Sequence, residues 1–140
     1  MKYKKFGKDF VLRVETGEDI FEQVMALAEK EDIRLASVSG IGAVDDITLG
    51  VFNLETKQYD EQHYTGNHEI TALCGNITTM DGKKYVHLHM TAAGADGKGV
   101  AGHLFKGIVS LTGEIFISVF EGEVNRKFSE KVGINLIEFN

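Results

Sequence analysis

The chain has 140 residues, of which 43% are hydrophobic and 26% are charged, and its formal net charge is −6. This composition is typical of a single globular domain over residues 1–140, and the negative charge opposes non-specific binding to nucleic acid. The sequence has no apolar run of about 18 residues that could span a membrane and no apolar signal-peptide core near its start, so we expect a cytoplasmic protein.

The N-terminal part of the sequence predicts a strand followed by the one main helix. Large apolar residues recur at every second position of residues 8–14, as in a half-buried strand. Apolar residues then recur every three or four positions from Ile20 to Leu27, which indicates a helix over about residues 17–31 with Thr16 as its N-cap. Lysines at four of the first eight positions fit a solvated terminus as well as a basic patch.

Beyond the helix the apolar period changes to two, which predicts strands separated by turns and glycine-rich loops. We expect loops at residues 40–44 and 65–68. The only cysteine, Cys74, is in phase with Ile70 and Ala72, which favours a buried and inert thiol. The predicted fold class is α+β, a mainly antiparallel sheet of about seven strands packed with one main helix.

Residues 84–105 predict a hairpin that carries three histidines. Residues 94–99 are rich in glycine and should form the turn between two strands. Side chains alternate between the faces of a strand, so His87 and His89 lie on the same face. A turn centred near the middle of this segment sets His103 opposite about residue 90, and a shift of one residue sets it opposite His89 with His87 on the diagonal.

Three neutral imidazoles on one face could hold a metal ion with a position left open for water. Such a set describes catalytic rather than structural zinc sites, and imidazole also suits copper, iron and nickel. The alternative is a pair of histidines on a solvated strand face with His103 as a hydrogen-bonded edge residue. The pattern alone leaves both interpretations open.

The sequence as a whole resembles the PPC domain, the plant and prokaryote conserved domain, which occurs beside AT-hooks in plants and alone in bacteria and archaea. The resemblance covers nearly all residues, and it rests on a combination of motifs: Arg13 with Gly17-Glu18-Asp19, Ser39-Gly-Ile-Gly-Ala43, Glu69-Ile with Leu73-Cys-Gly-Asn-Ile77, His87-Leu-His89, Asp96-Gly97, Gly102-His103-Leu104, Arg126 and the stretch from Gly133 to Leu136.

The resemblance implies a small α+β domain that assembles as a homotrimer, and an architecture similar to that of acetolactate decarboxylase. It also implies a metal, zinc or another divalent transition metal, at His87, His89 and His103. The family often has two glycines before the third histidine where this chain has Ala101-Gly102, and alanine should be tolerated there unless a positive φ is needed. No Arg-Gly-Arg-Pro AT-hook is present, so binding of nucleic acid by this chain alone is not expected.

Two functions compete at this point. The first is a trimeric metal-binding protein that acts as a hydrolase or lyase on an unidentified small molecule, with Glu69 and Glu114 as candidate fourth ligands or general bases. Both glutamates are equally well explained as exposed charges. The second is an assembly or regulatory module without chemistry, related to DNA-binding proteins by family.

Overall fold

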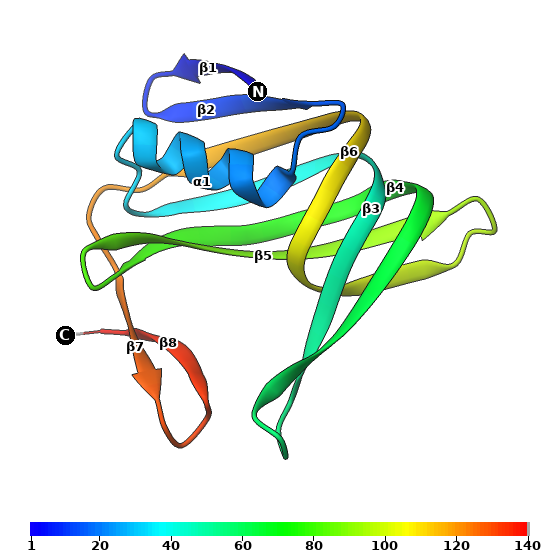
Figure 1. Ribbon diagram of the computed structural model, residues 1–140. Helices are drawn as coiled ribbons and strands as arrows, with labels where there is room; N and C mark the ends of the chain where they lie inside the picture. Colours follow the sequence, from blue (N-terminus) through cyan, green and yellow to red (C-terminus); the bar gives the residue numbers. More distant parts are fainter. Residues whose placement is uncertain (140) are drawn as a thin grey trace.

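The computed structural model describes residues 1–139, which form one eight-stranded sheet and one helix (Figure 1). No helix within these residues is long and apolar enough to cross a membrane. In chain order the elements are β1 (Lys2–Phe6), β2 (Asp9–Glu15), α1 (Ile20–Lys30), β3 (Ala36–Asn53), β4 (Gln58–Met80), β5 (Lys83–Gly94), β6 (Gly99–Val119), β7 (Asn125–Ser129) and β8 (Ile134–Glu138).

Four long strands form a closed ring within the sheet. The strands follow the order β1-β2-β6-β3-β4-β7-β8, and β5 pairs with both β4 and β6. Since β3 also pairs with both β4 and β6, the strands β3, β4, β5 and β6 close on themselves. The turn between β3 and β4 projects beyond the rest of the sheet (Figure 1).

The helix α1 packs on the sheet through its apolar stripe, as its sequence predicts. The buried residues of α1 are Ile20, Val24, Leu27 and Ala28. They join apolar side chains from β2, β3, β4, β5 and β6, including Leu12, Val38, Ile77, Leu88 and Ile115, in one core. Burial of this apolar surface is the main force that holds the helix against the sheet.

Asp19 joins the start of α1 to the sheet. It is the N-cap of the helix, where its Oδ1 accepts a hydrogen bond of 3.0 Å from the Glu22 amide. Its Oδ2 accepts a second bond of 3.0 Å from the buried Gly107 amide of β6. The sequence analysis instead placed the cap at Thr16, whose hydroxyl bonds the Leu111 carbonyl. Asp19 serves as the cap because its two carboxylate oxygens can accept hydrogen bonds from the helix and from β6 at the same time.

Two segments expected to be loops are parts of continuous strands. Residues 40–44 lie within β3 and residues 65–68 within β4, and shifts in register mark bulges there instead of chain reversals. Gly42 shows why glycine is needed: its φ is +151°, and a Cβ atom there would lie 2.2 Å from the Thr112 carbonyl oxygen of β6. The glycines therefore allow neighbouring strands to approach closely while pairing continues.

The predicted fold class is wrong in its details. Residues 1–139 form mainly sheet, with eight strands instead of about seven and a single helix of 11 residues. The topology of this part of the chain gives no support to the expected likeness to acetolactate decarboxylase. The additional N-terminal strand is β1, where a solvated terminus or basic patch was considered, and its Lys2 and Lys5 form ion pairs with Glu15 and Glu31.

The prediction of a buried cysteine is also wrong, because Cys74 is exposed. A shift in the β4–β5 register between Ile70 and Ala72 changes the face on which the following residues lie. Leu73 consequently faces the core, and Cys74 faces outward beside His89 of β5. A single bulge thus reverses an assignment made by counting every second residue.

We predict that Asp19→Ala lowers the free energy of unfolding by about 2–4 kcal/mol, because it removes the helix cap and leaves the buried Gly107 amide without its acceptor. Chemical denaturation of the purified variant measures this loss. Thr16→Ala is the matched control and should change stability by less than about 0.5 kcal/mol, since its hydrogen bond is exposed. Equal losses in the two variants would contradict the role given to Asp19.

Candidate metal centre

The turn between β5 and β6 sets the register of the histidine hairpin. The Gly97 amide bonds the Gly94 carbonyl at 2.9 Å, and the Gly94 amide bonds the Lys98 carbonyl at 3.1 Å. From this turn the strands pair antiparallel, with His89 directly opposite His103. This is the shifted register considered in the sequence analysis, the one that brings all three histidines together.

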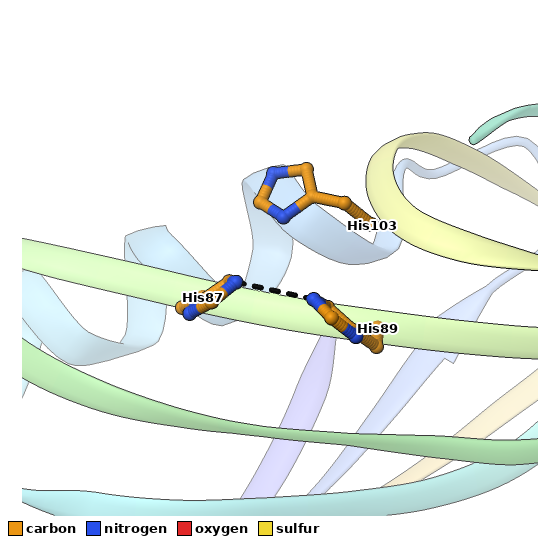
Figure 2. Close-up of side chains that lie close together, drawn as sticks. All are labelled: His87, His89 and His103. Carbon is orange, nitrogen blue, oxygen red and sulfur yellow. Dashed lines mark hydrogen bonds between the residues drawn. The ribbon is translucent and has the colours of Figure 1, made fainter. Parts of the chain in front are cut away.

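His87, His89 and His103 converge on one point of the sheet surface (Figure 2). One ring nitrogen from each lies within 4.8 Å of the other two. The Nε2 atoms of His87 and His89 are 3.2 Å apart, and the ring centroids of the three pairs are separated by 5.0, 5.0 and 5.7 Å. Within residues 1–139 this is the one cluster of three or more potential metal ligands.

The donor set fits a borderline metal ion such as zinc. Two nitrogens bound to one zinc at about 2.0–2.1 Å in tetrahedral geometry lie about 3.3 Å apart. The 3.2 Å separation of the His87 and His89 nitrogens matches this spacing. In addition, Nδ1 of His103 is buried and has no hydrogen-bond partner within the described chain, so an imidazole nitrogen remains unsatisfied.

Aromatic side chains cover His103 and fix its orientation. Tyr59 of β4 lies beside the imidazole with a centroid separation of 4.8 Å, and Phe105 of β6 lies at 4.7 Å. Burial, with smaller contributions from the neighbouring His87 and His89, lowers the pKa of His103 from its ordinary value of 6.5 to about 4. His103 is therefore neutral at pH 7, the form that binds a metal.

A buried arginine lies near His87 and anchors the C-terminal hairpin to the sheet. Arg126 of β7 donates hydrogen bonds to Thr78 Oγ1, Asn76 Oδ1 and the Asn135 carbonyl at 2.8, 2.9 and 3.0 Å. Burial lowers the pKa of His87, and the nearby His89 and Arg126 lower it further. Cationic charge is thus disfavoured at His87, whereas an uncharged, metal-binding imidazole is not.

The structure brings together the three predicted histidines but does not add either predicted glutamate to the cluster. Glu69 pairs with Ala93 and lines a separate cavity of about 470 Å³ together with His68. Glu114 is exposed on β6 opposite Arg13 of β2. A catalytic role for these two carboxylates stays a prediction, and neither belongs to the group of ligand atoms around the histidines.

One position beside His103 departs from the family's usual residue. Ala101, which stands where the family often has glycine, is not among the described non-glycine residues with positive φ.

Tyr59 was missed by the sequence analysis, because it reaches His103 from the turn-proximal end of β4, more than 40 residues away in the chain. In the sequence, Tyr59 is marked only by its place in an alternating strand pattern after the Asn53–Gln58 turn. Many surface tyrosines share this pattern.

Comparisons with known proteins identify the family. Residues 1–121 match the Plants and Prokaryotes Conserved (PCC) domain, and the chain therefore belongs to that family. The structure is similar to that of a protein from Bacteroides thetaiotaomicron that is provisionally named as DNA-binding, with 32% identity, a TM-score of 0.95, and coverage of 99% of this chain and 96% of that one. The family resemblance inferred from the sequence is thereby confirmed.

A second solved structure is that of a protein from Archaeoglobus fulgidus described as metal-containing. The two sequences are 34% identical and the TM-score is 0.88. The match covers 99% of this chain and 100% of that one. The curated bifunctional protein GlmU from Synechococcus is 31% identical over 119 residues, which are 79% of this chain. The matched part is only 17% of the length of GlmU.

We predict that the metal-free protein loses stability as the pH falls from about 6.5 to about 4, partly through His103. Its folded pKa of about 4 lies below its ordinary 6.5, so the unfolded chain binds this proton more readily in that window. His103→Asn should show a smaller loss over the same range. Urea denaturation at several pH values measures this difference, and parallel pH profiles in the two proteins would contradict it.

Proposed function

We propose that this protein binds one divalent transition metal, zinc in the first instance, through His87, His89 and His103. The observation that carries the proposal is the convergence of three imidazoles in which two nitrogens already lie 3.2 Å apart. The unsatisfied Nδ1 of His103 and the lowered pKa values of His87 and His103 support it. The metal-containing protein from Archaeoglobus fulgidus supports it further.

The proposed chemistry is that of a hydrolase or lyase acting on a small molecule. A metal held by three neutral histidines supplies Lewis acidity, which polarises a carbonyl group or lowers the pKa of bound water. The chain itself contributes an exposed side at His89, through which a ligand can enter. It also contributes the aromatic wall of Tyr59 and Phe105, which keeps water from the His103 side.

We also propose that the protein is a homotrimer, as the family resemblance implies. The face of the sheet opposite α1 bears exposed apolar side chains on β3 and β6, with Ile41, Leu111 and Phe116 exposed by 56, 70 and 54%. Phe116 lies opposite Val11 of β2, and both line a shallow apolar depression. Exposed apolar side chains of this kind favour association with further copies of the chain.

DNA binding is the weaker candidate, despite the provisional name of the similar structure from Bacteroides thetaiotaomicron. The net charge of −6 repels phosphate groups. Of the lysines near the N-terminus, Lys2 and Lys5 are paired with Glu15 and Glu31, which reduces the positive potential of β1. The surface charges therefore favour a metal-dependent function over direct binding of DNA.

We predict about one zinc ion per chain in protein purified without a histidine tag, and little or none in His89→Ala, because two imidazoles hold the ion much less tightly than three. Elemental analysis measures the metal content. Without metal, His89→Ala should have a free energy of unfolding within about 0.5 kcal/mol of that of the metal-free wild type, since His89 is exposed.

His63→Ala is the matched control for this experiment. His63 is an exposed histidine whose Nε2 contacts Asp46 at 2.9 Å, and it is not in the cluster. The His63→Ala variant should keep its full metal content. Unchanged metal in His89→Ala, or equal loss in both variants, would show that the metal is bound elsewhere.

We predict that Phe116→Glu converts the trimer to monomers, because three carboxylates would be buried in an apolar contact. Size-exclusion chromatography with light scattering measures the mass of the assembly. Leu54→Glu introduces the same charge at a side chain that is 78% exposed in the β3–β4 turn, and it should leave the mass unchanged. A monomeric wild type, or a trimeric Phe116→Glu variant, would refute the proposed interface.

A further inference from the structure

A cavity opens beside the histidine cluster where β5 and β6 separate. The two strands pair from Ala93 and Gly99 to His89 and His103, and beyond this last pair β6 continues along β3 instead. The helix α1 closes the resulting gap through Phe21 and Met25. The cavity has a volume of about 310 Å³, and His103 forms part of its wall.

The lining of this cavity is mainly apolar. Phe21 and Met25 of α1, Val86 of β5, and Leu104 and Phe105 of β6 face it, and the lining is completed by His103, Tyr85 and Lys84. The Lys84 side chain is only 6% exposed, and its ammonium group is paired with Asp32. The charge at this end is therefore compensated by Asp32, whose side chain is 69% exposed, which leaves the cavity suited to a hydrocarbon group.

Two half-buried side chains suggest that the cavity is not simply a gap in the core. Phe21 and Met25 lie at the edge of the core with part of their surface exposed, although fully buried residues of α1 flank them. Phe105, which contacts the His103 ring, is 36% exposed. These three residues present apolar surface that a ligand could remove from water.

We propose that the ligand of the metal centre is a small amphipathic acid or carbonyl compound whose polar head binds at the three histidines and whose apolar tail occupies this cavity. The inference rests on the proposed metal-binding function. His103 belongs to both the cluster and the cavity wall, so the head and the tail of the ligand would meet beside this residue. At about 30 Å³ per water-sized group, the cavity holds a tail of roughly ten heavy atoms at most.

The test uses the zinc-loaded full chain and straight-chain hydroxamic acids with two to ten carbons, which place a metal-binding head on tails of increasing length. Isothermal titration calorimetry measures each dissociation constant, and elemental analysis afterwards checks that the metal is retained. We expect the dissociation constant to fall about fourfold for each added methylene until the cavity is filled, which corresponds to about 0.8 kcal/mol per buried CH₂.

Variants of the cavity wall locate the tail. Met25→Trp fills the cavity and should abolish the dependence of the dissociation constant on chain length. The dissociation constant of the two-carbon compound and the metal content should stay unchanged. Met25→Leu nearly conserves the volume and should keep the dependence. Phe21→Ala enlarges the cavity from its half-buried rim and should move the plateau to longer chains, which provides a second measurement if Met25→Trp does not fold.

The outcomes separate the two proposals. A protein that takes up zinc but binds all chain lengths equally would overturn the amphipathic ligand and leave the metal centre intact. Chain-length dependence that is unchanged in both Met25→Trp and Phe21→Ala would likewise place the tail elsewhere, for example against a second copy of the chain. Failure to bind zinc at His87, His89 and His103 would overturn both proposals.

Discussion

The pairing of His89 with His103 is the contact on which the rest of this structure depends. It ends the short ladder between β5 and β6, and that ladder closes the ring formed by β3, β4, β5 and β6. The same pair brings together imidazoles from two strands. A slip of one residue would turn His103 to the opposite face and place a neighbouring residue beside His89. Closure of the ring and formation of the candidate site are therefore one constraint, set by the turn from Gly94 to Lys98.

The candidate site has two sides with different environments. His103 is enclosed by Tyr59 and Phe105, whereas His89 is exposed. This difference matters because a metal centre needs fixed ligands on one side and access for a ligand on the other. Tyr59 comes from the β3–β4 hairpin and Phe105 from β6, so the enclosed side depends on the long strands remaining continuous through their bulges.

Local patterns in the sequence predicted the helix and the histidine hairpin, because alternation and turn chemistry act over a few residues. They left open the register that brings His87, His89 and His103 together, and only the family resemblance implied it. The sequence could not predict features set by distant pairing. Glycines at residues 40–44 indicated a loop, yet β6 passes close enough to make them part of β3. The bulge after Ile70 likewise exposed Cys74, and the tertiary bond to Gly107 made Asp19 the helix cap. The approach of Tyr59 to His103 has the same origin.

The strand order has a consequence for the way the chain reaches this structure. The strand β2, second from one edge of the sheet, pairs with β6 through Phe10 and Ile117, which are separated by most of the chain, while its other neighbour is only the short β1. During synthesis from the N-terminus, the apolar side chains of β2 and α1 must wait for residues near 117 before the core can close. The β1–β2 hairpin then has an unpaired edge for most of that time. The exposed lysines of β1, including Lys4 and Lys5, discourage other nascent chains from pairing with the outer edge of this hairpin.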